Sequence, residues 1–98
     1  MEVRYAGTVA TRPIFFTSRH SHLTHEQFDV RGDDGATFRV VDNVTIAPRV
    51  PVQPGDRVTV QGELIRPRGQ PPIVHWTHRD PRHHHPDGFI AAGNAIYA

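Results

Sequence analysis

Apolar and polar residues alternate in short runs along the chain, and Pro or Gly separates one run from the next. In the first run, Val3, Tyr5 and Val9 alternate with the polar residues Arg4 and Thr8. Successive side chains of a β-strand point to opposite faces, so this spacing is typical of a strand with one buried face. The same pattern predicts five main strands, at residues 3–9, 25–30, 36–41, 57–64 and 73–78.

Three segments break the alternation. We expect residues 14–24 to form a loop or a widened bend, and Asn43–Arg49 to form one short helical turn. Phe89-Ile90 and Ile96-Tyr97 flank a Gly-Asn pair, which predicts a short closing hairpin. Five strands with a helical turn between the third and the fourth follow the order of an OB-type barrel. The predicted fold is therefore all-β, a small five-stranded OB-like barrel that forms a single domain over residues 1–98.

The composition supports a β fold. The chain has eleven Val and six Ile but only two Leu, and β-branched side chains favour strands over helices. Val, Ile, Leu and Phe together make up 24 of the 98 residues, and the net charge is only +1. This combination excludes a disordered chain and argues against a helical bundle.

Charge and cysteine content narrow the classes of function. Eleven Arg and no Lys stand against ten acidic residues, so no large basic field for duplex DNA is expected. Protonation of all eight His would bring the net charge close to +9. The absence of cysteine excludes disulfides and thiolate zinc sites. No apolar run has membrane-spanning length and no signal peptide is recognisable, so we expect a cytoplasmic protein without membrane partners.

The segment His75-Trp-Thr-His-Arg-Asp-Pro81 is the most distinctive motif of the chain. It resembles the signature H-W-T-H-H-D-P, followed by a His and then by G-W-I, of a family of small bacterial domains of unknown function. Further matching positions are His25, Phe28, the segment Asn43–Arg49, Gly55-Asp56, His85, Gly88 and Ile90. The chain departs from this pattern with Asp42 for His, Arg79 for the second central His and Phe89 for Trp. The resemblance strengthens the case for a site built on these residues and implies no particular reaction.

His78 and Asp80 form the first candidate site. If the strand continues through them, the two side chains share a face, while Val74 and Trp76 face the core. A carboxylate beside an imidazole orients the ring and raises its basicity, as a general base or a metal ligand requires. Alternatively, His78 is a rim residue hydrogen-bonded to the backbone, and Asp80 only begins a turn.

The remaining histidines fall into two groups. Those that match no family position are expected to be solvated: His20, His22, His83 and His84. His25 and His85 do match family positions, and they would join the first candidate site if the closed barrel brings them near it. The candidate ligands for Zn²⁺ or another divalent ion are then His25, His78, Asp80 and His85, although their spacing matches no standard zinc motif.

Arginine could supply contacts to phosphate. Arg49 could clamp a phosphate or carboxylate through its planar guanidinium, unless it forms a salt bridge with Asp42 or Asp56. Nuclease domains on OB barrels place an Asp and an Arg in this region, an analogy at the level of the fold that points to Arg39 and Asp42. The candidate ligand-binding residues are Trp76, Thr77, His75, Asn43, Arg49 and Arg39.

Three functions are compatible with these residues. The first is binding of single-stranded nucleic acid, or of another phosphate-bearing ligand, through aromatic stacking and arginine contacts. The alternative is phosphodiester hydrolysis, with or without a metal, in which Asp80 orients His78 as base and His25 or His85 is its partner. A third is a non-catalytic domain that senses metal or binds another protein. Convergence of the four candidate metal ligands would favour the hydrolase.

Overall fold

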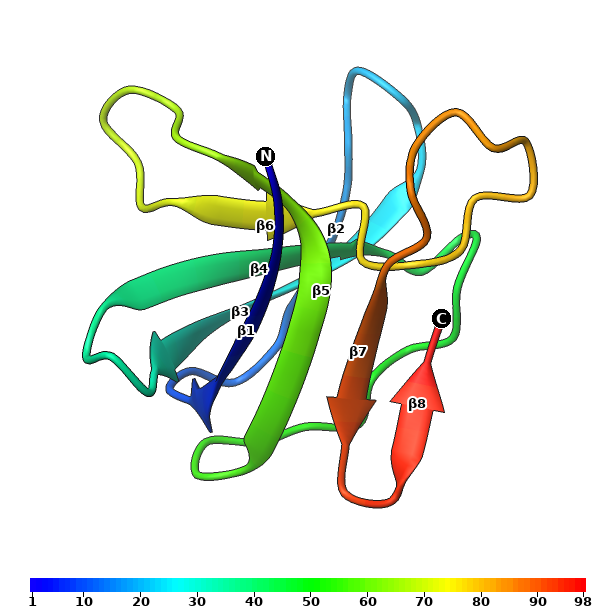
Figure 1. The fold of residues 1–98 in the computed structure, drawn as a ribbon. Coiled ribbons are helices and arrows are strands. Elements are labelled where there is room, and N and C mark those ends of the chain that lie inside the picture. Colours follow the sequence, from blue (N-terminus) through cyan, green and yellow to red (C-terminus); the bar gives the residue numbers. More distant parts are fainter.

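The computed structural model describes residues 1–98 and contains eight β-strands and no helix (Figure 1). The strands are β1 (Glu2–Val9), β2 (Ile14–Thr17), β3 (Thr24–Gly32), β4 (Thr37–Asn43), β5 (Arg57–Ile65), β6 (Ile73–His75), β7 (Phe89–Ala92) and β8 (Ala95–Tyr97). No segment forms a helix long and apolar enough to cross a membrane. The predicted all-β class is confirmed.

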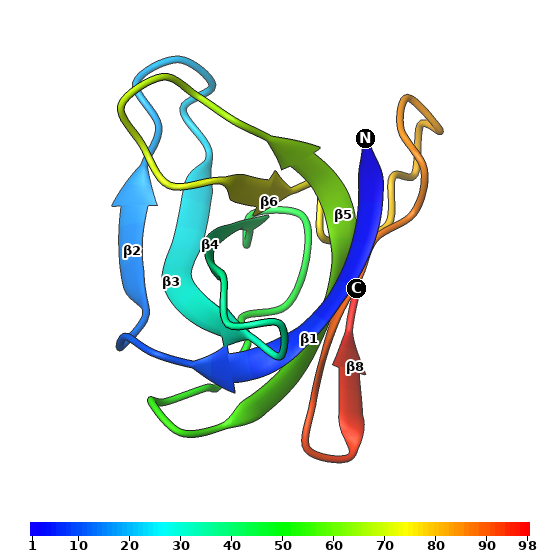
Figure 2. The same ribbon diagram turned by 60° about the vertical axis from the view of Figure 1, so that its left-hand side comes forward.

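Five of the strands close into a barrel. β1 pairs with β3, β3 with β4, β4 with β6 and β6 with β5, and β5 returns to pair with β1. Figure 2 shows these strands arranged around a common centre. Only the β4–β6 pair is parallel. A five-stranded barrel with this order is an OB-like barrel, as the sequence pattern predicts.

Alternating side chains fill the barrel. Phe28 and Val30 on β3 are buried, as are Val58 and Val60 on β5, and they belong to a core of twelve buried apolar residues. The intervening residues face outward, among them His25 on β3. Because side chains alternate along a strand, His25 lies on the outer surface of the barrel.

The segment between β4 and β5 is a turn and not the predicted helical turn. The Asn43 side-chain oxygen accepts hydrogen bonds from the N–H groups of Thr45 (3.1 Å) and Ile46 (3.3 Å). A single bond of helical type runs from the N–H of Ala47 to the carbonyl of Asn43 (3.0 Å). The Asn side chain competes with helical hydrogen bonding, and Pro48 has no N–H to continue it.

Two short additions flank the barrel. The segment predicted as a loop at residues 14–24 begins with strand β2, which pairs with β3. All four β2 residues are exposed, so no alternation marks them as a strand. The predicted closing hairpin is confirmed as β7 and β8, and β7 pairs with β5.

The fifth strand is predicted to run from residue 73 to residue 78, but it ends at His75. The residues after it therefore lie elsewhere than predicted. β6 stops at His75, and Trp76 adopts the left-handed conformation with φ of 55°. Trp76 is consequently 42% exposed, and not in the core as expected. A Cβ on Gly88 would lie 2.2 Å from the Trp76 carbonyl oxygen, so this glycine leaves the room that the turn needs.

Candidate functional site

A groove of about 720 Å³ lies where β3 begins and where β4 and β6 end. Its other wall is the loop that follows β6 and carries Trp76 and Arg82. The groove is unusual in its histidine content, because five of the eight histidines of the chain line it: His25, His75, His78, His84 and His85. A volume of this size is typical of sites that hold a small ligand or one unit of a polymer.

Trp76 is the middle ring of a stack of three aromatic rings. Its indole stacks on the His75 ring (centroids 4.6 Å apart) and on the His85 ring (4.7 Å, with the planes 9° apart). A left-handed backbone conformation costs a bulky residue on the order of 1–2 kcal/mol. The surrounding contacts hold this conformation, which keeps the indole in the groove and out of the core.

His78 and His85 present the same ring nitrogen for chemistry. His78 Nδ1 lies 2.6 Å from the Arg79 carbonyl oxygen, and His85 Nδ1 lies 2.8 Å from the Pro86 carbonyl oxygen. A carbonyl only accepts hydrogen bonds, so Nδ1 carries the proton in both rings and the lone pair of each neutral ring is on Nε2. The two rings meet edge to face with centroids 5.1 Å apart.

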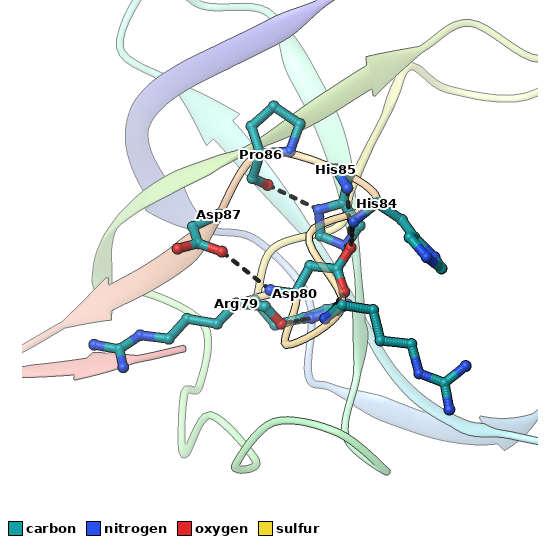
Figure 3. A network of polar contacts seen from close by, with 8 residues as sticks. Arg79, Asp80, His84, His85, Pro86 and Asp87 are labelled. Atoms are coloured by element: carbon teal, nitrogen blue, oxygen red, sulfur yellow. Dashed lines mark hydrogen bonds and ion pairs between the residues drawn. The ribbon is translucent and has the colours of Figure 1, made fainter.

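Asp80 organises the loop and does not orient His78, in contrast to the hypothesis from the sequence. Its carboxylate accepts hydrogen bonds from the backbone N–H groups of Arg82 (2.9 Å), His84 and His85 (2.9 Å), as Figure 3 shows for the loop. The partner of His78 is instead the backbone carbonyl described above. Burial raises the pKa of Asp80, but these N–H groups outweigh it and hold the pKa below its ordinary value.

The four residues expected to converge do so only in part. His85 Nε2 lies 3.9 Å from an Asp80 carboxylate oxygen, and the His78 ring touches the His85 ring. His25 lines the same groove from β3, where its ring stacks on Phe16 (5.5 Å between centroids). No three His, Asp or Glu side chains form a group that could hold a metal ion. The Zn²⁺ set of the sequence analysis is therefore not assembled as a coordination site.

The candidate ligand-binding residues separate into two groups. His75, Trp76 and Asn43 line the groove, although the Asn43 amide oxygen also closes the turn after β4. Three others lie outside it: Thr77, Arg49 and Arg39. Arg39 pairs with Asp29 (2.9 Å), and the Arg49 guanidinium lies 4.6 Å from the centre of the Phe15 ring, without the salt bridge considered above.

Two carboxylic acids lie inside the barrel beneath the groove. Glu26 on β3 and Asp42 on β4 are direct cross-strand partners and are 0% and 1% exposed. The N–H of Val50 donates to Glu26 Oε1 (2.8 Å), and the Thr77 hydroxyl donates to Asp42 Oδ1 (2.9 Å). The second oxygen of each carboxyl group has no hydrogen-bond partner. The burial of both acids could have been predicted from the sequence, because alternation places Glu26 on the same face as Phe28 and Asp42 on the same face as Val40.

Burial dominates the protonation of both acids. It raises the pKa of Asp42 to about 6, although the hydrogen bond from Thr77 and the neighbouring N–H of Asn43 lower it. Burial also raises the pKa of Glu26, against the N–H of Val50, and the neighbouring Asp42 adds to the increase. Thr77 directly follows Trp76, so Asp42 holds the groove loop from inside the barrel.

Sequence reasoning missed two basic residues of the groove. Arg82 and His84 line it, although His84 was expected to be a solvated bystander. Their backbone N–H groups bind the Asp80 carboxylate, which brings the loop back on itself. An Asp-Pro step followed by polar residues is the available signal for such a turn. The other expected bystanders are exposed and lie outside the groove: His20, His22 and His83.

Comparison with known proteins places the chain in a family. No curated protein and no solved structure matches it. A family model described as a protein of unknown function (DUF3465) matches residues 2–98, nearly the whole chain. The resemblance identified in the sequence to a family of unknown function is thereby confirmed. The chain belongs to the DUF3465 family, whose description assigns no activity.

Proposed function

We propose that this domain binds single-stranded nucleic acid in the histidine-lined groove. The position of the groove is the observation that carries the proposal. OB barrels bind oligonucleotides on the outer face of their second and third strands, which here are β3 and β4. His25 on β3 and Asn43 on β4 line the groove at this face.

The chemistry of the groove suits unpaired bases. Proteins hold single strands largely by stacking bases on aromatic side chains, because every base has a π-face. The stack of Trp76, His75 and His85 offers one such platform, and the stacked pair of Phe16 and His25 offers a second. Trp76 is 42% exposed and Phe16 is 37% exposed, so both rings are accessible to a ligand.

Charge in the groove favours a polyanion. Arg82 and His84 are exposed in the groove wall and can reach phosphate oxygens. The negative charge of Asp80 is bound by three backbone N–H groups of its own loop and is thereby partly neutralised. With a net charge of only +1 for the chain, we expect few phosphate contacts and a shallow dependence of affinity on salt.

Trp76 is the only tryptophan and reports on the groove directly. Titration with an oligothymidylate should quench its fluorescence, and the anisotropy of a labelled oligonucleotide should give the same dissociation constant. Trp76→Ala should weaken binding about 5- to 150-fold, because stacking of one base contributes about 1–3 kcal/mol. Ile96→Ala is a matched control, since Ile96 is 70% exposed on β8 outside the groove.

Two outcomes would contradict the proposal. Absence of quenching and of an anisotropy change would show that the groove does not hold a single strand. Equal competition by a nucleoside monophosphate and by the oligonucleotide, at equal phosphate concentration, would instead indicate a small phosphate-bearing ligand. A difference of more than tenfold in favour of the oligonucleotide is the expected result, because a polymer reaches several contacts at once.

A further inference from the structure

His78 and His85 form an imidazole pair in the wall of the groove. Both rings are nearly buried, with 5% of His78 and 8% of the His85 side chain exposed, and both line the groove. Each Nδ1 is engaged by a backbone carbonyl, so each Nε2 is free to accept or to donate a proton. Two imidazoles in contact at a shielded site are suited to moving protons in opposite directions.

The groove offers no evident protein nucleophile beside this pair. The chain has no cysteine, and the Asp80 carboxylate is engaged by three backbone N–H groups. The Ser21 hydroxyl oxygen accepts a hydrogen bond from the N–H of Leu23 and makes none to a histidine ring. A reaction promoted by this pair therefore takes its nucleophile from water or from the substrate, and RNA carries a substrate nucleophile in its 2′-hydroxyl group.

We infer that the groove cleaves single-stranded RNA, with His78 and His85 as general base and general acid. This inference rests on the nucleic-acid binding proposed above. His78 Nε2 takes the proton of a 2′-hydroxyl, and the 2′-oxygen forms a bond to the adjacent phosphorus. The bond from phosphorus to the 5′-oxygen breaks, and His85 Nε2 gives its proton to that oxygen. The products are a 2′,3′-cyclic phosphate and a 5′-hydroxyl, and proton exchange with water restores the two rings.

Asp80 determines which histidine has which role. Its carboxylate oxygen lies 3.9 Å from His85 Nε2, so a proton carried on that nitrogen is next to a negative charge. His85 is therefore assigned as the acid, and His78, which has no carboxylate contact, as the base. The step consumes neither water nor an oxidant, and no metal takes part in it.

The test compares one oligonucleotide sequence as RNA and as DNA. Both are labelled, incubated with the domain in the presence of EDTA, and assayed for binding and for cleavage. The variants are His78→Asn and His85→Asn, because an Asn amide keeps a donor for the backbone carbonyl and removes Nε2. His83→Ala, purified in the same way, is the control: His83 is exposed in the same loop and does not line the groove.

The expected result separates binding from chemistry. RNA is cleaved to a 2′,3′-cyclic phosphate and a 5′-hydroxyl, identified by mass spectrometry, and DNA is bound but left intact. Each Asn variant lowers the cleavage rate at least about 100-fold, as loss of a general acid or base does. Cleavage rates are compared at saturating protein concentration, because His85→Asn also removes a ring of the stacking platform and weakens binding, whereas His78→Asn leaves that platform in place. His83→Ala cleaves like the unsubstituted protein.

Other results overturn the inference. Bound RNA that remains intact excludes cleavage while leaving nucleic-acid binding in place. Cleavage of DNA as well as RNA, loss of cleavage in EDTA, or undiminished cleavage by both Asn variants shows that this pair and the 2′-hydroxyl are not responsible. Failure to bind either oligonucleotide contradicts the proposed function, and the inference fails with it.

Discussion

Thr77 links the groove to the interior of the barrel through one hydrogen bond. Its side chain is fully buried, and its hydroxyl is the donor to Asp42 Oδ1. Thr77→Val keeps the shape but leaves a second carboxyl oxygen of Asp42 unpaired, so the free energy of unfolding should fall by about 1–3 kcal/mol. Chemical denaturation measures this change. Thr37→Val, at an exposed β4 position, is the control, and an equal effect of the two substitutions would contradict the role of this bond.

Asp42 should make the stability of the domain depend on pH. Folding raises its pKa from 3.8 to about 6, so the folded protein holds more protons than the unfolded chain between these values. The free energy of unfolding therefore falls as pH rises from about 4 to about 6 and levels off above, by at most about 3 kcal/mol. Asp42→Asn should remove most of this fall and be more stable than the unsubstituted protein at neutral pH.

Denaturation curves collected across this pH range test the expectation for Asp42. A smaller fall should remain in Asp42→Asn, because folding also raises the pKa of Glu26. Glu2→Gln, which removes an exposed acid of β1, is the control for the loss of one carboxylate. A curve for Asp42→Asn that runs parallel to that of the unsubstituted protein would show that Asp42 does not titrate with folding.

The conformation of the loop after β6 depends on the absence of a side chain at Gly88. The Gly88 Cα packs against this loop, and an added Cβ would lie 2.2 Å from the Trp76 carbonyl oxygen and 2.9 Å from the Thr77 Cα. These are backbone atoms that cannot move aside, so Gly88→Ala should destabilise the domain by about 1–3 kcal/mol or more. The Trp76 emission maximum should shift as well. Gly35→Ala meets open space but has φ of 89°, so it isolates the cost of backbone strain.

Alternation explains why the barrel could be predicted and why part of the site could not. The pattern around Phe28 and Val60 identifies strands because each buries one face. The barrel order is predicted from five such strands with an irregular segment between the third and the fourth. When the same alternation is extended through Trp76, it predicts that the indole lies in the core, which is wrong. One left-handed residue reverses the alternation, and the space for it comes from Gly88, twelve residues later. Such a long-range steric condition leaves no periodic signal in the chain.

The partners of Asp80 illustrate a second limit. Asp80 lies in the same short segment as His78 and His85, and its carboxylate is 3.9 Å from His85 Nε2. Its hydrogen bonds go instead to backbone N–H groups of residues 82–85, which a residue pattern does not display. The sequence therefore predicted which side chains gather at the groove more reliably than which atoms they contact.

On the scale of the whole molecule, the near balance of charge makes histidine protonation important. The net charge is +1, and five of the eight histidines line one groove. Protonation of those that face solvent would add positive charge at the proposed binding site. We therefore expect affinity for an oligothymidylate to increase about three- to tenfold between pH 8 and pH 6 at constant ionic strength. His75 should contribute least, because burial lowers its pKa although the nearby Glu63 opposes this.

Anisotropy titrations at the two pH values, with matched variants, identify the residues responsible. His84 is exposed in the groove wall, so His84→Gln should reduce the gain in affinity on acidification. His20 is also exposed but lies outside the groove, so His20→Gln should preserve the whole gain. The fold itself supports the experiment, because Asp42 binds its proton more tightly in the folded state and acidification across its pKa stabilises the barrel. An equal loss in both variants would assign the effect to net charge alone, and an affinity independent of pH would exclude the histidines from phosphate binding.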